Sequence, residues 1–298
     1  MNGAWYEQRE QSAGRLRLRL MWLAYEWLGK SALKALCVPV VLFIYPFAHP
    51  AKSALRKYYT VLGKFRGAKS VRKPSVWTIF RHLLGFAWSL VDKTDACTLK
   101  KSLPRMFIRD DDGWRAFREC AAAGRGCFVI TSHIGTIEVL PALPVSCPEL
   151  PRIPHVHAFQ QMSHDAIFTE MFMRHFDASS FMLHDVENIG VETAVEMKEA
   201  IEEGAMVLMA GDRVSAGSSK TLRQRFMGVE CEWPKGVFAF ARLMDAPVFF
   251  ATCVHTGWNA YEAHFATAHG ELLPSYASFL ESEALAHPGE WHNFHDFF

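Results

Sequence analysis

Two patterns of apolar positions follow one another along the chain after residue 126. In the first pattern, short runs of apolar and β-branched residues are typical of buried strands. These strand-like runs are residues 127–131, 156–159, 179–183, 205–210, 247–254 and 261–268. In the second pattern, apolar residues recur three and four positions apart, as on one face of a helix. The helix-like stretches are residues 166–176, 191–203, 234–244 and 274–286. This alternation predicts an α/β fold with a mixed, largely parallel sheet that is flanked by helices.

Two further helices are predicted before residue 126. Residues 75–91 carry apolar side chains at helical spacing, and Ser75 is in place to cap the first turn. The run of aspartates at residues 110–112 resembles a metal site at first sight. Acidic residues are also favoured at the start of a helix by the helix dipole, and Trp114 and Phe117 follow at helical spacing. We therefore predict a helix start at this point and not a metal site.

The first 73 residues are strongly basic. They contain 14 Lys or Arg and 3 Asp or Glu, whereas the remainder contains 18 basic and 28 acidic residues. Residues 35–48 form an uncharged run of fourteen residues interrupted by Pro39 and Pro46. A spanning helix needs about 20 apolar residues, so interfacial attachment to an anionic lipid surface is favoured over a span. The run disfavours nucleic-acid binding, because nucleic-acid-binding arms are usually polar throughout. A buried core helix with solvated basic neighbours remains the alternative.

Composition places the rest of the chain among ordinary folded proteins. Half of the residues are hydrophobic, which suffices for a large core. We expect an N-terminal helical membrane-associating segment over residues 1–73 and one large α/β domain over residues 74–298. The seven cysteines are dispersed and form no C-x-x-C pair, which indicates reduced thiols and not a disulfide framework or a zinc site. No cleavage site of a signal peptide is evident.

Residues 126–143 are the stretch that reads most clearly as a reactive site. A buried strand is followed by the break Ser132-His133-Ile134-Gly135 and then by helix-compatible spacing. In α/β folds, ligands bind beyond the carboxyl ends of the strands. Glu138 lies five residues after His133, and a turn that folds back would bring its carboxylate to the imidazole. Such a pair fixes the imidazole tautomer and prepares it to act as a general base.

A second polar stretch, residues 211–228, also follows a predicted strand. Asp212 and Arg213 should emerge at the same edge of the sheet as His133. The glycine- and serine-rich residues after them predict a long functional loop, and its cations Lys220, Arg223 and Arg225 could hold a phosphate. Alternatively, Asp212 and Arg213 pair with one another and the later cations are solvated.

The segment SHIGTIE at residues 132–138 resembles the H-(F/L/I)-G-x-x-E signature of the bacterial lipid A late acyltransferases, within the lysophospholipid acyltransferase superfamily. The likeness continues through Gly-Asp-Arg at 211–213, Phe-Met-Gly at 226–228, Pro-Lys-Gly at 234–236 and the terminal HPGEWHNFHDFF, and it is similar to a divergent branch. It covers about residues 114–298. Two positions depart from the lipid A enzymes: Thr136 stands where they carry asparagine, and residues 156–161 lack their arginine.

The resemblance implies a glycerolipid acyltransferase-like fold and an enzyme that moves an acyl chain from a thioester to a hydroxyl. His133 would be the catalytic base, with Glu138 orienting it in the H-x4-E motif. The substrate pocket would involve Asp212, Arg213, Arg223, Arg225 and Gly228. The donor would be acyl carrier protein or coenzyme A in thioester linkage, and the acceptor a lipid or glycolipid. No metal or other cofactor is implied. The location would be the cytoplasmic face of the bacterial inner membrane, with a peripheral or single-pass attachment.

Two other functions remain open. The dipeptides His164-Asp165, His184-Asp185 and His295-Asp296 would suit a metal-dependent phosphohydrolase, although their flanking sequences are dissimilar. A non-catalytic, membrane-bound docking factor for a carrier protein would share the basic N-terminal segment but would not need His133. A nucleophilic hydrolase is disfavoured, because no G-x-S-x-G motif is present.

Overall fold

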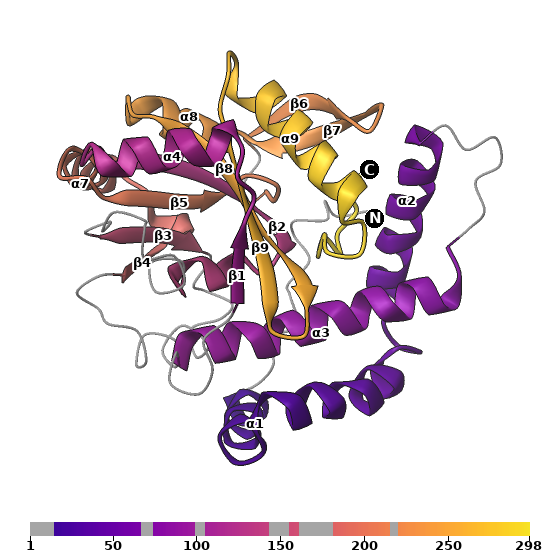
Figure 1. The fold of residues 1–298 in the computed structure, drawn as a ribbon. Coiled ribbons are helices and arrows are strands. Elements are labelled where there is room, and N and C mark those ends of the chain that lie inside the picture. The colour runs from indigo at the N-terminus through magenta and orange to yellow at the C-terminus, as the bar shows by residue number, and fades with distance from the viewer. Residues whose placement is uncertain (1–14, 67–73, 99–104, 143–154, 161–180, 215–219) are drawn as a thin grey trace.

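The computed structural model describes residues 15–66, 74–98, 105–142, 155–160, 181–214 and 220–298 (Figure 1). Its centre is a seven-stranded sheet of order β1-β9-β8-β2-β5-β3-β4. The strands are β1 (Arg105–Ile108), β2 (Cys127–Gly135), β3 (Val156–Gln160), β4 (Phe181–Asp185), β5 (Met206–Ala210), β8 (Val248–Gly257) and β9 (Ala260–Thr267). A separate hairpin consists of β6 (Thr221–Phe226) and β7 (Val229–Pro234).

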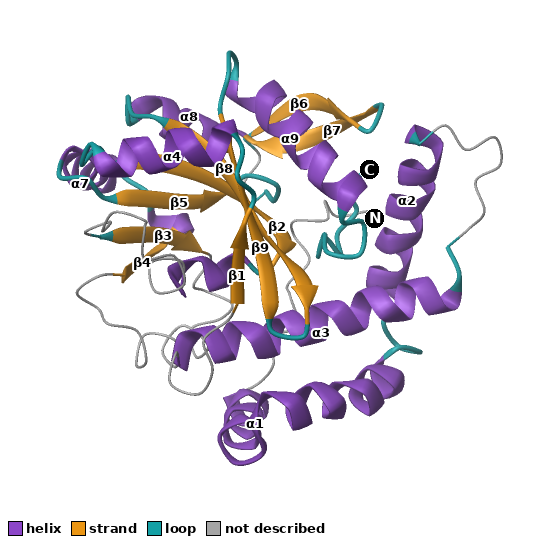
Figure 2. Ribbon diagram, viewed as in Figure 1, coloured by secondary structure: helices purple, strands orange, loops and turns teal. Residues whose placement is uncertain are grey.

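The sheet is mixed and mostly parallel. Strands β8, β2, β5, β3 and β4 run in one direction, whereas β9 is antiparallel to β8 and carries β1 parallel to itself. Strand β2 lies between β8 and β5, so the strand that carries His133 has a neighbour on each side. Together with the flanking helices (Figure 2), this arrangement confirms the predicted α/β class.

Both faces of the sheet are covered, as a parallel sheet requires. The helices that follow the basic segment are α3 (Val76–Thr98), α4 (Asp112–Ala122), α7 (Val191–Glu202), α8 (Lys235–Leu243) and α9 (Leu272–Ala286). On one face, Phe128 and Ile130 of β2 belong to a large core with α7, α8 and α9. On the other face, Cys127 and Val129 pack in a smaller core with α4. Alternate side chains of one strand thus enter opposite cores.

The helix starts expected from the sequence are confirmed. Helix α3 begins after Ser75, whose Oγ accepts a hydrogen bond of 3.0 Å from the backbone N–H of Thr78. Helix α4 begins after Asp111, whose carboxylate accepts a hydrogen bond of 3.0 Å from the backbone N–H of Trp114. The aspartate run therefore lies at a helix start, as predicted, and Asp111 also caps the helix. The expected helix at residues 166–176 lies outside the described residues.

The prediction of one long loop over residues 211–228 is wrong in its second half. Residues 221–226 form β6, and the two-residue turn to β7 has positive φ angles at Met227 (49°) and Gly228 (77°). Positive φ at both central residues is the hallmark of a type I′ hairpin turn, for which glycine is a preferred residue. The hairpin and the short strand β1 were not predicted. The serine and glycine residues that precede β6 are typical of loops, so local composition did not predict the hairpin.

The predicted break at residues 132–135 is also wrong. Strand β2 continues through His133 to Gly135, and a short 3-10 helix, η2 (Ile137–Ala142), replaces the expected α-helix. Gly135 has a φ of 73°, and a Cβ atom there would lie 1.9 Å from the backbone oxygen of Cys253. The glycine of the motif thus permits β2 to pass close to β8, where the strand register shifts.

The basic N-terminal segment forms the helices α1 (Arg15–Ile44) and α2 (His49–Phe65). Residues 23–44 of α1 are long and apolar enough to cross a membrane, but the helix is broken at Gly29, where φ is 77° and ψ is 172°. Immediately after the break, Lys30 and Lys34 reach the carboxylate of Asp92 in α3 at 2.8 Å and 2.7 Å. Helix α1 is therefore tied to α3 by buried charges as well as by apolar contacts.

Helix α2 contributes to the main core. Leu55, Tyr58 and Leu62 are buried there, and the Tyr58 ring meets the Trp291 ring edge-on at 5.2 Å. Residues 49–65 therefore share a hydrophobic core with the sheet and belong to the same folded unit.

Candidate functional site

His133 and Asp212 meet at the carboxyl ends of two adjacent parallel strands. Strands β2 and β5 are paired up to Thr131 and Ala210, and each functional residue follows that pair by two positions. The sequence predicted this shared edge because the parallel strands of an α/β sheet have their carboxyl ends on one side. The structure confirms that the two residues are brought together.

Asp212 holds His133 through both of its oxygen atoms. Oδ1 accepts a hydrogen bond of 2.8 Å from Nδ1–H of the imidazole, and Oδ2 accepts one of 2.9 Å from the backbone N–H of the same residue. Oδ2 also accepts a hydrogen bond of 2.9 Å from the indole N–H of Trp291. Three donors on one carboxylate fix its position and, through it, the plane of the imidazole.

The electrostatics of the pair favour an ionised Asp212. Its side chain is 1% exposed, and burial by itself would raise the pKa of the carboxyl group. The positive charge of a protonated His133 and the hydrogen bonds from His133 and Trp291 outweigh burial, so the pKa lies below its usual range. The His133 side chain, by contrast, is 40% exposed. A buried anion thus stands behind an imidazole that solvent can reach.

This geometry selects one tautomer of His133. With the proton on Nδ1 directed at Asp212, the lone pair belongs to Nε2, at the opposite side of the ring. A proton taken up at Nε2 produces an imidazolium that the adjacent carboxylate stabilises. The arrangement can therefore serve as a general base and then as a general acid.

The final aromatic stretch of the sequence packs directly on this site. The backbone N–H of His292 donates to the carbonyl oxygen of His133 at 2.9 Å, and the N–H of Gly135 donates to the carbonyl oxygen of Glu290 at 2.8 Å. Trp291, 1% exposed, lies between these two contacts and bridges to Ile134. Residues 290–292 therefore form a short strand-like segment on the end of β2. The burial of Trp291 shows that it packs in the core and does not face lipid.

Two histidine environments flank this segment. Nε2–H of His82 donates a hydrogen bond of 2.9 Å to the carbonyl oxygen of Trp291. His82 and His292 both lie among aromatic rings. Burial lowers the pKa to about 4 for His82 and to about 3 for His292. Both rings are neutral at physiological pH.

On the other flank, His255 lies between two carboxylates. Its Nε2 is 2.7 Å from Asp92 and its Nδ1 is 2.8 Å from Glu290. Burial alone would lower the pKa of His255, but hydrogen bonds to both carboxylates and their negative charges raise it to about 9. This histidine is charged at physiological pH and links α3 to the segment on β2.

Glu138 lies in η2, three residues after the motif glycine Gly135. Its side chain is outside the described part of the structure, so its contact with His133 stays a prediction. The described carboxylate on Nδ1 is that of Asp212, a residue that the resemblance assigned to the substrate pocket. Thr136, which stands where lipid A enzymes carry asparagine, is buried with its backbone N–H bonded to the carbonyl of Cys253 at 2.7 Å.

The other expected pocket residues lie in two places. Arg213 directly follows Asp212 and is partly buried, at the edge of the sheet where His133 lies. Arg223 and Arg225 are exposed on the β6–β7 hairpin, opposite Glu232 and Glu230 in the strand register, and Arg223 is 3.5 Å from Glu230. The acidic neighbours offset the positive charge that a phosphate would need. Gly228 is explained by the hairpin turn itself.

The hairpin nevertheless connects to the site through aromatic packing. Phe226 at the end of β6 meets the Trp291 ring at 5.3 Å, and the backbone N–H of Met227 donates to Glu281 at 2.5 Å. The motif at residues 226–228 therefore supports the tryptophan that donates to Asp212. This is a structural role for a block that the resemblance assigned to the pocket.

The His-Asp dipeptides do not act as one group in the described structure. Asp185 accepts hydrogen bonds from the N–H of Glu187 and the amide of Asn188, while Asp296 pairs with Lys57 at 2.5 Å. The third dipeptide, at residues 164–165, lies outside the described residues. His184 has a different partner, His157, which is considered below.

Trp291 contacts the candidate site and was not predicted by the sequence analysis. The available signal was its place in the terminal motif, directly before His292. A hydrogen bond between residues that are 79 positions apart has no signature in local patterning.

Compared with known proteins, the sequence matches no family model and no curated protein.

Proposed function

We propose that the protein is an acyltransferase that moves an acyl chain from a thioester to a hydroxyl group. One observation carries the proposal: a solvent-accessible imidazole, His133, is held through Nδ1 by the buried carboxylate of Asp212 at the carboxyl edge of an α/β sheet. The SHIGTIE segment around His133 supports the acyltransferase reading over other uses of a general base.

The reaction needs one proton acceptor and no covalent enzyme intermediate. Nε2 of His133 removes the proton of the acceptor hydroxyl as its oxygen attacks the thioester carbonyl. The tetrahedral intermediate then collapses, the carbon–sulfur bond breaks, and the imidazolium returns the proton to the departing thiolate. Asp212 stabilises the imidazolium between these two steps and keeps the ring in one tautomer. The products are an ester and a free thiol.

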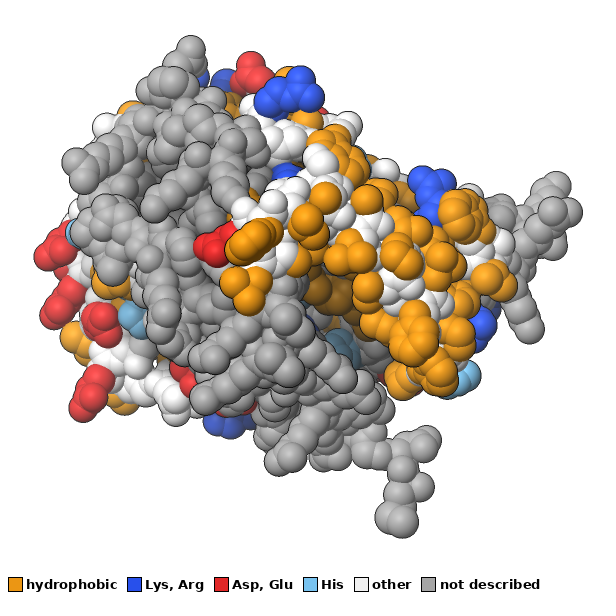
Figure 3. Space-filling model, turned by 90° about the horizontal axis from the view of Figure 1, so that it is seen from below, with side chains coloured by type: hydrophobic (Ala, Val, Ile, Leu, Met, Phe, Trp, Pro, Cys, Tyr) orange, Lys and Arg blue, Asp and Glu red, His pale blue; other side chains and the backbone are white. Residues whose placement is uncertain are grey.

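A lipid or glycolipid acceptor is supported by the apolar surface of the N-terminal helices. Several large apolar side chains on α1 and in the turn after it face solvent, among them Trp27 (85% exposed), Phe43 (75%) and Phe47 (70%). Figure 3 views the molecule from the side on which α1 lies, and apolar side chains gather there. Exposed apolar patches of this kind mark membrane or protein contact sites. The surrounding segment carries 14 basic and 3 acidic residues, which favours an anionic lipid surface.

Attachment in the plane of the interface agrees better with this helix than a transmembrane span. The break at Gly29 leaves an uninterrupted helix of residues 30–44, about 22 Å long at 1.5 Å per residue, against a hydrocarbon core of about 30 Å. Lys30 and Lys34 at its start are held by Asp92, so a span would carry their charges and α3 into the bilayer. We place the protein on the cytoplasmic face of the bacterial inner membrane, where acyl carrier protein and coenzyme A thioesters are available.

The activity is tested with full-length protein on anionic vesicles. Radiolabelled acyl carrier protein and acyl coenzyme A thioesters are supplied separately, together with membranes from cells that lack the gene. We expect labelled lipid from one donor, and we expect His133→Gln to reduce the yield at least about 100-fold, the usual range for loss of a general base. His269→Gln is the matched control, because His269 is exposed on a turn. Labelled lipid at wild-type rates with His133→Gln would exclude the mechanism and favour a docking role.

Membrane attachment is tested separately by flotation with vesicles that contain anionic lipid. Replacement of Trp27, Phe43 and Phe47 by serine should lower the bound fraction several-fold, since each buried aromatic contributes on the order of 1.5–3 kcal/mol. The control replaces Val191 and Leu243, which are exposed elsewhere on the molecule, by serine. Equal losses in both variants would contradict a specific membrane face.

A further inference from the structure

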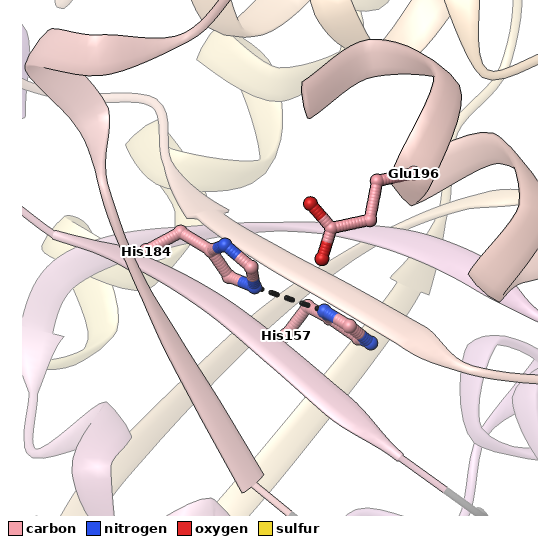
Figure 4. A group of neighbouring side chains, drawn as sticks. All are labelled: His157, His184 and Glu196. Atoms are coloured by element: carbon pink, nitrogen blue, oxygen red, sulfur yellow. Dashed lines mark hydrogen bonds between the residues drawn. The ribbon is translucent and has the colours of Figure 1, made fainter. Parts of the chain in front are cut away.

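A second histidine group lies on the other side of β5, away from β2. His157 in β3 and His184 in β4 face each other with Nδ1 of the first 2.9 Å from Nε2 of the second (Figure 4). Glu196 of α7 points toward the same place, and one ligand atom from each of the three residues lies within 4.8 Å of the other two. Two neighbouring strands and the helix that covers them thus direct three potential metal ligands to one point.

The strand register explains why the imidazoles meet. Phe159 is paired with His184, and His157 lies two residues before Phe159 on the same face of β3. This is the face that belongs to the main core, where α7 also packs through Met197 and Ile201. The two rings are nearly parallel, with centroids 5.1 Å apart. The arrangement is set by rigid elements and not by a surface loop.

The chemistry of the three side chains suits metal binding. A neutral imidazole is the form of histidine that binds metals, and an ionised carboxylate supplies a negatively charged ligand. Without an ion, the contact consists of one hydrogen bond between Nδ1 of His157 and Nε2 of His184, with the Glu196 carboxylate beside it.

The dimensions also agree with a small tetrahedral ion. Donors about 2.1 Å from Zn²⁺ at a tetrahedral angle are separated by roughly 3.4 Å. The observed contact of 2.9 Å and the limit of 4.8 Å for the whole group bracket this value. Two imidazoles and one carboxylate leave a fourth position for water or another ligand.

We propose that His157, His184 and Glu196 bind one divalent transition-metal ion, for which Zn²⁺ is the best fit. The ion joins β4, the last strand in the sheet order, to β3 and to helix α7. Its site lies apart from His133, since β5 separates β3 from β2. The proposal does not depend on the proposed acyl transfer, and it replaces the expectation from the resemblance that the protein holds no metal.

The test uses full-length protein that has been stripped with a chelator and titrated with Co²⁺ as a spectroscopic substitute for Zn²⁺. We expect one bound ion per chain, with the visible absorption of a four- or five-coordinate site and without the near-ultraviolet thiolate bands that the seven cysteines would produce. Zn²⁺ should displace the Co²⁺ and raise the midpoint of thermal unfolding.

Three variants decide the assignment. His184→Gln should weaken Zn²⁺ binding at least about 100-fold, and Glu196→Gln at least about 10-fold, because each removes a direct ligand. Glu202→Gln is the matched control: it removes one exposed carboxylate from the same helix, far around its axis from Glu196. Glu196 is exposed, so its variant should fold, and unfolding in the presence of chelator checks this for all three.

The proposal is overturned if the wild type binds no Co²⁺ at equimolar concentration, or if thiolate bands accompany binding. It is equally overturned if His184→Gln and Glu196→Gln bind as tightly as Glu202→Gln. Measurement of acyl transfer is not needed for any of these outcomes.

Discussion

His133 and His157 lie on opposite sides of strand β5, and their partners give them different chemistry. The imidazole of His133 faces the carboxylate of Asp212, whereas that of His157 faces the imidazole of His184. A carboxylate at Nδ1 favours the protonated ring and prepares Nε2 for proton transfer. A second imidazole offers no negative charge, and burial then keeps both rings neutral. The same side chain is thus suited to proton transfer at one site and to metal ligation at the other.

The most direct test of this difference between the two histidines is to change the partner of His133. In Asp212→Asn, the amide can donate to Nδ1 and hold the ring in the wrong tautomer, so we expect acyl transfer to fall by roughly 10³-fold. The rate constant at saturating thioester is the measurement. Glu138→Gln is made in parallel, since the sequence assigned the orienting role to that residue. A large loss with Glu138→Gln and none with Asp212→Asn would return that role to Glu138.

The next largest effect should come from the backbone that places His133. Gly135→Ala puts a Cβ atom 1.9 Å from the oxygen of Cys253 at a φ of 73°. We expect the free energy of unfolding to fall by about 3 kcal/mol or more, because both strain and a backbone clash are introduced. Gly228→Ala in the hairpin turn is the comparison: its φ is also positive, at 77°, but nothing lies within 4 Å of an added Cβ. Denaturant unfolding of the two variants should rank them in that order.

Loss of the indole donor should have an intermediate effect. Trp291→Phe removes one of the three hydrogen bonds on Asp212 while most of the packing against Phe226 remains. We expect about a 10-fold loss of acyl transfer, equivalent to about 1.4 kcal/mol, with the fold retained. A positional role also predicts a shifted pH–rate profile, whereas a purely structural role would lower stability and leave the profile unchanged.

The last comparison concerns the pH dependence of stability, which should have opposite signs at two histidines. The pKa of His157 is lowered to about 4 in the folded state, so the unfolded chain binds more protons between pH 4 and 6.5 and stability rises with pH there. The pKa of His255 is raised to about 9, so its contribution is complete below pH 6.5 and is lost as pH rises through 9.

Chelator-treated His157→Gln and His255→Gln should therefore flatten different limbs of the stability curve, the acidic limb for the first and the alkaline limb for the second. Thermal unfolding across the pH range measures both. If both variants changed the same limb, the contrast between a neutral and a charged histidine would be wrong.

The sequence predicted the two strands that carry the site and the edge at which they meet. Alternation of strand and helix patterns placed His133 and Asp212 at the carboxyl ends of strands, and the register of β2 with β5 confirms this. It did not predict that strand β2 continues through His133. Gly135 looks like a break in a local reading, but here it allows a close approach between two strands that are distant in sequence.

Local sequence patterns also did not predict contacts between residues that are distant in sequence. The hydrogen bond from Trp291 to Asp212 and the pairing of His157 with His184 depend on the order of strands in the sheet, which periodicity does not specify. The hairpin β6–β7 was hidden because its flanking residues resemble a loop. The sequence analysis missed the proposed metal-ligand group because it considered His184 together with its sequence neighbour Asp185, which caps a turn instead.

The buried charges that follow Gly29 have a geometric consequence for a protein that rests on lipid. Lys30 and Lys34 hold Asp92, Asp92 holds His255, and His255 holds Glu290, whose carbonyl receives the N–H of Gly135. If α1 lies in the interface of a bilayer, its depth would therefore fix the height of the His133 imidazole above the membrane. An acceptor hydroxyl at one level of the headgroup layer would come within reach, and hydroxyls at other levels would not.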